Sequence, residues 1–166
     1  MIHVWILFLF VACGGDGFPR NALDIAFLID SSSQVLSATN FNFIKQFAID
    51  VMSAYDVGLM SVRVSVATFS GDATLRWNLT AFSTQGELQQ QIANLQLEGG
   101  DSNVVAALRL ARQTIFTVGN GDRPTVPNVA FLILGSRPNN RFARASLDLL
   151  VRACIELRVL LQCGGG

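Results

Sequence analysis

The chain has 166 residues, of which 51% are hydrophobic and 14% are charged, with 12 basic and 12 acidic side chains. This length and apolar content are enough for one domain with a buried core, and they argue against an intrinsically disordered chain. The balanced charge argues against an extended basic surface for nucleic acid and against an acidic tail.

The first segment, residues 1–17, is predicted to be a signal peptide. Its apolar block, Val4 to Ala12, is too short to cross a bilayer as a helix, and the small residues Cys13 and Gly14 follow it. We expect cleavage after Gly14 and a secreted chain; a bare membrane anchor is the alternative. Cleavage would also remove His3, the only histidine, and with it any Ser-His-Asp or Cys-His catalysis.

Strands and helices alternate along the rest of the chain. The apolar run Ile25 to Ile29 is typical of a strand that is covered on both faces, whereas Asn40 to Tyr55 carries apolar side chains at helical spacing. The predicted elements are strand 25–29, helix 40–55, strands 62–69 and 73–78, a short helix that a capping box opens at Thr84, helix 102–116, strand 129–134, helix 143–157 and strand 159–162. This order predicts one α/β domain, doubly wound around a mainly parallel sheet.

A run of carboxylate and hydroxyl side chains, Asp30-Ser31-Ser32-Ser33, follows the first of these strands. In open α/β sheets, ligands bind beyond the carboxyl ends of the strands. Oxygen ligands of this kind suit a hard cation such as Mg²⁺. Polar caps at the entry to the next helix are the other interpretation, and the residue types alone do not choose between the two.

The run from Asp30 to Gln34 resembles the metal-binding loop of von Willebrand factor type A domains, whose pattern is Asp-x-Ser-x-Ser. The other stretches that carry the resemblance are Val66 to Ser70, Trp77 to Leu79, Leu97 to Leu108 and Phe131 to Pro138. The resemblance covers about Asp24 to Gly164 and is strongest to the domains of collagen VI and matrilin-type matrix proteins. It implies a doubly wound α/β fold that binds proteins at the carboxyl ends of its strands, often through a Mg²⁺ ion that an acidic side chain of the partner completes.

The resemblance also implies that residues 24–164 form a single domain that is incomplete at its C-terminus. Members of the family normally continue through another helix and strand after the strand expected at 159–162. We therefore expect a domain that is truncated after its fifth strand, with an unpaired edge.

The resemblance places three metal ligands on matching positions: Asp30, Ser32 and Ser102, the last with a Ser for the usual Thr. Two positions depart from the family. Gln34 stands where the family has a second loop Ser, and Gly135 stands where it has an Asp. Because ligand charge sets the affinity for divalent ions, we expect a degenerate site with weak or no Mg²⁺ binding and no other cofactor. Asp101 is a substitute carboxylate that does not align.

Two surface features are singled out. Asn78-Leu79-Thr80 is an acceptor for N-glycosylation. Arg137, Arg141 and Arg144 form a basic loop beside the expected metal site, which either contacts an acidic partner or is simply solvated.

Cys154 and Cys163 are predicted to stay unpaired. They fall at the end of a predicted helix and at the far end of the strand that follows it. Five strand residues rise roughly 17 Å, whereas the Cα atoms of a disulfide need to lie within about 7 Å.

These observations predict a secreted, non-enzymatic matrix or adhesion module that binds extracellular matrix proteins such as collagens, without nucleic acid and without a membrane span. A non-functional truncated product is one alternative. A hydrolase that uses Asp30 is another, but it lacks a second placed acid, a histidine and a glycine-rich phosphate loop.

Overall fold

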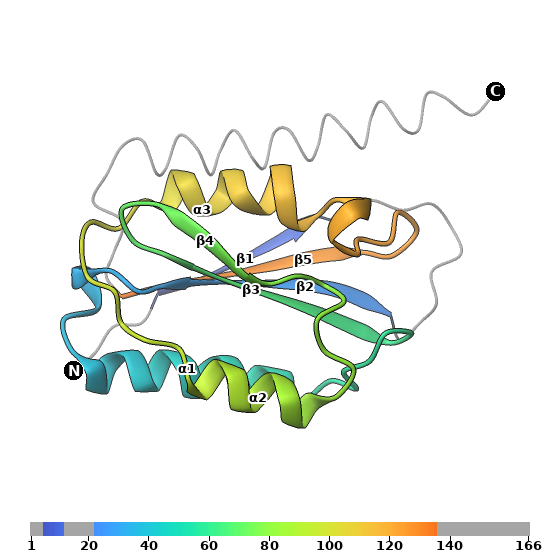
Figure 1. Ribbon diagram of the computed structural model, residues 1–166, viewed down its shortest axis with the longest axis horizontal. Coiled ribbons are helices and arrows are strands. Elements are labelled where there is room, and N and C mark those ends of the chain that lie inside the picture. The colour runs from blue at the N-terminus through green and yellow to red at the C-terminus, as the bar shows by residue number, and fades with distance from the viewer. Residues whose placement is uncertain (1–4, 12–21, 136–166) are drawn as a thin grey trace.

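The computed structural model describes residues 5–11 and 22–135 (Figure 1). The predicted helix 143–157, the predicted strand 159–162, the arginine loop and the two cysteines Cys154 and Cys163 lie outside the described residues.

A sheet with the strand order β1-β5-β2-β3-β4 forms the centre of the fold. Strand β2 (Leu23–Asp30) lies between β3 (Val62–Phe69) and β5 (Asn128–Leu134), and pairs with both in parallel. Strand β4 (Ala73–Trp77) pairs antiparallel with the outer edge of β3. The predicted α/β class with a mostly parallel sheet is therefore confirmed for strands β2 to β5.

Side chains of the central strands alternate between two apolar cores. On one face, Ile25, Phe27 and Ile29 pack under helices α1 (Ala38–Met52) and α2 (Gln85–Ala93) (Figure 1). On the other face, Ala26 and Leu28 pack under helix α3 (Val104–Leu110) (Figure 1). Every residue of β5 is buried, as the continuous apolar run predicts for a strand covered on both faces.

Two helices begin at residues whose hydroxyl groups satisfy the first backbone N–H groups. Helix α1 (Ala38–Met52) begins after Ser37, and helix α2 (Gln85–Ala93) begins after Thr84. The hydroxyl of Thr84 accepts the backbone N–H of Glu87, as the predicted capping box requires.

The helix predicted over 102–116 differs in the structure. Helix α3 (Val104–Leu110) starts after the cap residue Asn103 and passes into a π-helical turn, Ala111–Ile115. An apolar face at helical spacing does not distinguish a wider turn from a regular one, so this change of pitch could not be predicted.

Strand β1 (Trp5–Val11) pairs antiparallel with the outer edge of β5, from Trp5 opposite Leu134 to Val11 opposite Asn128. The same segment is predicted from its sequence to be a leader, and its removal stays a prediction. If it is removed, the outer edge of β5 loses this pairing. Within the part of the chain that the structure describes, no helix is long and apolar enough to cross a membrane.

Candidate functional site

The polar run after β2 lies at the carboxyl end of the sheet, as predicted. Asp30 is only 1% exposed, and Ser31 and Ser32 are fully buried. A carboxylate at this depth requires hydrogen-bond donors, because burial without partners would cost several kcal/mol.

Three donors from three separate segments meet the carboxylate of Asp30. Its Oδ1 accepts the backbone N–H of Ser32 (2.9 Å), while Oδ2 accepts the hydroxyl of Ser102 (3.0 Å) and the backbone N–H of Gly135 (3.2 Å). The structure thus brings together Asp30, Ser32, Ser102 and Gly135, and their expected role as remnants of a metal site stays a prediction. All three donors are neutral, so among the residues that the structure describes the carboxylate is stabilised by dipoles and not by a positive side chain.

Ser32 also caps a short turn. Its hydroxyl accepts the backbone N–H of Gln34 (3.1 Å) and begins the 3-10 turn Ser33–Val35. The side chain of Gln34 is exposed. This geometry matches the polar-cap interpretation of the loop.

Gly135 has no room for a side chain. A Cβ atom placed there would lie 2.7 Å from Cα and Cγ2 of Val35 and 2.8 Å from its backbone nitrogen. Real Cβ atoms essentially never come this close to backbone atoms. The turn that contains Val35 therefore occupies the space into which a carboxylate at position 135 would project.

The loop before α3 is fastened to the loop after β2. The backbone N–H of Ser33 donates to the carbonyl of Gly100 (2.9 Å), and the Ser33 hydroxyl accepts the N–H of Gly100 (3.0 Å). Gly99 and Gly100 both adopt a φ of +82°, which a side chain would strain. Asp101, the substitute ligand considered above, is exposed. Among the described residues, no group of three His, Cys, Asp or Glu side chains could hold a metal ion.

Glu98 is a second carboxylate at this end of the sheet, and no sequence motif singles it out. Its Oε2 accepts the hydroxyls of Ser31 (3.2 Å) and Ser70 (3.4 Å), and its Oε1 forms an ion pair with Arg76. Its backbone N–H also donates to the carbonyl of Ser31 (2.9 Å). The only signal was a charged residue between an apolar residue, Leu97, and two glycines.

Strand β2 also begins with a buried aspartate. Asp24 is fully buried, and its Oδ1 accepts Nε (2.9 Å) and Nη2 (2.6 Å) of Arg123, while its Oδ2 accepts the backbone N–H of Arg123 (2.8 Å). Burial raises the pKa of the adjacent Asp122, although the nearby Asn128 and Arg123 act in the opposite direction. One side-chain oxygen each of Asp122 and Asn128 is buried without a hydrogen-bond partner.

The predicted glycosylation acceptor follows β4. Asn78 is partly exposed, and its side-chain oxygen accepts the backbone N–H (3.1 Å) and the hydroxyl (3.1 Å) of Thr80. Both hydrogen bonds are accepted by Oδ1 of Asn78. Neither of them involves Nδ2, the atom to which an N-linked glycan would be attached.

Comparison with known proteins places this geometry in context. Residues 24–160 match the von Willebrand factor type A domain. Vitrin of Mus musculus is 31% identical over 131 residues, which are 79% of this chain and 20% of vitrin. The collagen alpha-5(VI) chain of Mus musculus is 34% identical over 128 residues, 76% of this chain and 5% of the collagen. Matrilin-4 of Homo sapiens is 29% identical over 133 residues, 78% of this chain and 21% of matrilin-4. The chain thus spans about a fifth or less of the length of these relatives.

Among solved structures, proximal thread matrix protein 1 from the mussel byssus shares the fold. It superposes with a TM-score of 0.55 at 24% identity over 67% of this chain and 28% of that chain. Another structure of the same mussel protein has a zinc-occupied MIDAS motif and an equal TM-score.

Proposed function

The chain belongs to the von Willebrand factor type A domain family, and we propose that it is a secreted module that binds extracellular matrix proteins without requiring a metal ion. Its relatives vitrin, collagen VI and matrilin-4 are extracellular matrix proteins, and the resemblance to them is confirmed. In this proposal residues 1–17 are removed, residues 24–164 form the binding module, and Asn78 carries a glycan.

One observation carries the metal-independent part of the proposal. The carboxylate of Asp30 already has three neutral donors, from Ser32, Ser102 and Gly135, and the turn at Val35 fills the space beside Gly135. Mg²⁺ gives up its water reluctantly and favours sites with carboxylates. A single buried carboxylate that is already hydrogen-bonded offers such an ion little advantage. Asp30, Ser32 and Ser102 therefore act as an internal brace that holds the loops of the binding face.

Leu36 supplies a contact on this face. It directly follows the turn at Val35, is 81% exposed and adopts a φ of +71°, the only positive φ of a non-glycine residue in the described part of the chain. An apolar side chain held in a sparsely populated conformation costs about 1–3 kcal/mol, and such strain concentrates at functional sites. In the proposal, Leu36 packs against an apolar side chain of the matrix partner.

Binding of the processed chain to immobilised collagen VI, measured in Mg²⁺ and in EDTA, tests the proposal. We expect equal affinity in both buffers and an affinity about tenfold lower for Leu36→Ala, which corresponds to about 1.4 kcal/mol of lost apolar contact. Met60→Ala is the matched control, because Met60 is also apolar and 89% exposed but precedes β3 at the opposite end of the sheet. Binding that EDTA abolishes, or equal losses for both variants, would contradict the proposal.

The alternative of a truncated product that does not fold makes a different prediction. Such a chain would show no cooperative thermal transition and would bind no partner in either buffer.

A further inference from the structure

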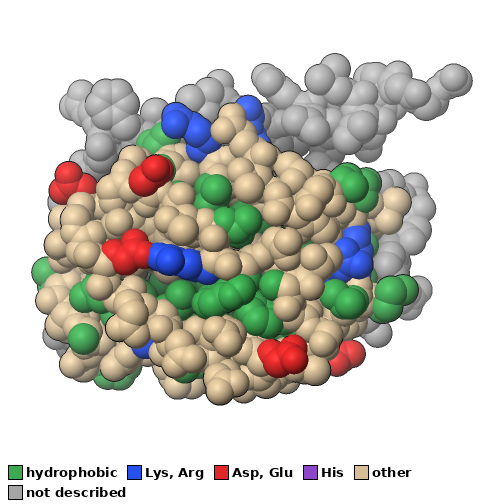
Figure 2. Space-filling model, viewed as in Figure 1, with side chains coloured by type: hydrophobic (Ala, Val, Ile, Leu, Met, Phe, Trp, Pro, Cys, Tyr) green, Lys and Arg blue, Asp and Glu red, His purple; other side chains and the backbone are tan. Residues whose placement is uncertain are grey.

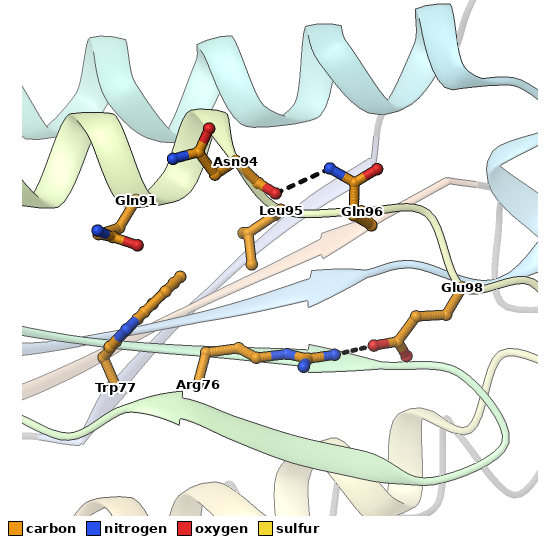
Figure 3. A pocket seen from close by; sticks show the side chains of 7 residues that line it. All are labelled: Arg76, Trp77, Gln91, Asn94, Leu95, Gln96 and Glu98. Atoms are coloured by element: carbon orange, nitrogen blue, oxygen red, sulfur yellow. Dashed lines mark hydrogen bonds and ion pairs between the residues drawn. The ribbon is translucent and has the colours of Figure 1, made fainter.

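A pocket of about 280 Å³ lies between β4 and the C-terminal end of α2 (Figure 3). Glu98, whose carboxylate accepts the hydroxyl of Ser31, is part of its lining. Trp77 and Leu95 provide its apolar walls, and Gln91 provides a side-chain amide beside the indole, whereas the side chains of Asn94 and Gln96 line the rim and point away from Trp77 (Figure 3). The amide of Gln96 donates to the backbone carbonyl of Asn94 (2.9 Å). The view of this face in Figure 2 shows an acidic and a basic side chain next to each other, beside a band of exposed hydrophobic side chains.

A β-bulge builds one wall of this pocket. The register of the β3–β4 pair shifts so that Trp77 lies opposite Val66 and Leu75 lies opposite Ala67, which leaves Arg76 as the extra residue. Trp77 packs against the core under α1 and α2, whereas Leu75 packs against the core under α3. Arg76 and Trp77 are consecutive, yet both point into the pocket (Figure 3). Bulges re-aim side chains in this way, and they are frequent beside binding sites.

The polar groups of the pocket are held in place. Nε of Arg76 donates to the hydroxyl of Thr68 (2.7 Å), and its guanidinium forms the ion pair with Glu98, each side chain being 32% exposed. The indole of Trp77 lies against Phe82, with the ring centres 5.6 Å apart and the planes at 59°. The site is therefore largely pre-formed, which lowers the entropic cost of binding a ligand.

The chemistry of the lining indicates the kind of ligand. The charges of Arg76 and Glu98 cancel, so the pocket does not compensate the desolvation of a charged ligand. Carboxamides both donate and accept hydrogen bonds, and the indole offers an apolar surface. A sugar ring presents hydroxyl groups at its rim and C–H groups on its faces, and the volume lies near the lower limit of about 300 Å³ for small-ligand sites.

We propose that this pocket binds one neutral sugar residue of a glycan, stacked on Trp77 and hydrogen-bonded by the amide of Gln91. An extended peptide added to the edge of β4 fits less well, because the bulge at Arg76 interrupts the regular spacing of backbone groups that such a strand would need. The proposal does not depend on the function of the Asp30 face.

Titration of the processed chain with N,N′-diacetylchitobiose and lactose, followed by NMR of the indole N–H of Trp77, tests this proposal, because Trp77 is the one tryptophan left after residues 1–17 are removed. The protein is first deglycosylated enzymatically so that a glycan on Asn78, next to Trp77, does not compete. We expect a saturable shift of the Trp77 indole signal with at least one of these sugars at about millimolar concentration. A charged heparin disaccharide should cause no shift.

Gln91→Ala should weaken the binding about tenfold, as expected for a lost hydrogen bond in a small site. The matched control is Gln89→Ala, since Gln89 lies on the same helix but its amide donates to Ser53 (3.3 Å) outside the pocket. No shift with either neutral sugar, a preference for the heparin disaccharide, or binding by Gln91→Ala that equals binding by the parent chain would overturn the proposal. A shift with an extended peptide alone would overturn it in favour of strand addition.

Discussion

Strand β2 carries a buried aspartate at each end, and the two are stabilised in different ways. Asp24 is paired with a cation, the guanidinium of Arg123, and the charge is neutralised inside the fold. Asp30 receives a hydroxyl and two backbone N–H groups, and none of these partners, all within residues 22–135, carries a charge. One end of the strand is thus fastened by an ion pair and the other by a network of dipoles that joins three loops.

The two kinds of stabilisation correspond to different roles of the two ends of the sheet. The ion pair between Asp24 on β2 and Arg123, in the segment before β5, fixes the amino ends of these strands without any bound ligand. The Asp30 network positions the loops that carry Ser33, Leu36 and Ser102 at the face where ligands bind in such folds. We propose that the carboxylate of Asp30 serves as a structural hydrogen-bond acceptor and not as a metal ligand.

The largest expected effect is at the ion pair. Asp24→Ala leaves the guanidinium of Arg123 buried without its partner, so the free energy of unfolding should fall by about 3–5 kcal/mol. Urea denaturation measures this change. The double variant Asp24→Leu with Arg123→Met removes both charges and should be clearly more stable than Asp24→Ala. A double variant that is equally unstable would show that packing, and not the unpaired charge, explains the loss.

The second effect is at Gly135. Gly135→Asp forces the turn at Val35 to move, and overpacking of this kind should cost about 1–3 kcal/mol. The variant restores the residue that the family has at this position, but it should not create a Mg²⁺-dependent shift in the melting temperature. Val35→Ala, added to Gly135→Asp, removes the contact with Cγ2 but not the contacts with Cα and the backbone nitrogen of residue 35. The double variant should therefore recover only part of the lost stability. A Mg²⁺-dependent shift in Gly135→Asp alone would mean that the turn yields more easily than its packing indicates.

The third effect is at the brace itself. Asp30→Ala removes the acceptor of three hydrogen bonds and leaves two backbone N–H groups and the Ser102 hydroxyl without it, so we expect a loss of about 1–3 kcal/mol. Hydrogen exchange should accelerate at Ser32 and Gly135, whose N–H groups bond the carboxylate, but not at Arg123. Equal acceleration at both ends of β2 would contradict a local role for Asp30.

The smallest effect concerns Asp122. Burial raises its pKa above the ordinary value of 3.8, so the folded state binds this proton more tightly than the unfolded state does. This contribution to stability is complete below pH 3.8 and is lost as the pH rises through the raised pKa. Asp122→Asn should therefore be slightly more stable than the parent chain at pH 7, by less than about 1 kcal/mol because solvent screens the group. Melting curves between pH 3 and 7 should converge at the acidic end, and a gap that widens toward acid would reverse the sign and refute this explanation.

The sequence predicted the elements that local patterns determine. The apolar run Ile25 to Ile29 identified the central strand, the capping box at Thr84 identified the start of a helix, and Asp30 was placed correctly at the carboxyl end of the sheet. These features depend on hydrophobic periodicity and on side chains that bond to nearby backbone, so neighbouring residues suffice to indicate them.

The features that were missed depend on residues far apart in the chain. Asp24 and Arg123 are separated by 99 positions, and Glu98 reaches Ser31 across 67. The collision between Gly135 and Val35 becomes visible only when two loops are placed together in space. From the sequence, Gly135 indicates only that a carboxylate ligand is missing. The structure shows in addition that Val35 occupies the space that such a side chain would need.

Thermal unfolding of the processed chain in millimolar Mg²⁺ and in EDTA tests directly whether Asp30 binds a metal ion. An ion present at 100 times its dissociation constant would stabilise the fold by about 2.7 kcal/mol, which a melting curve detects readily. We expect the melting temperature of the parent chain to be the same in both buffers. Asp30→Ala should melt at a lower temperature than the parent chain, and this temperature should also be the same in both buffers. A clear increase with Mg²⁺ in the parent chain that Asp30→Ala abolishes would show that Asp30 is still a metal ligand and not a structural brace.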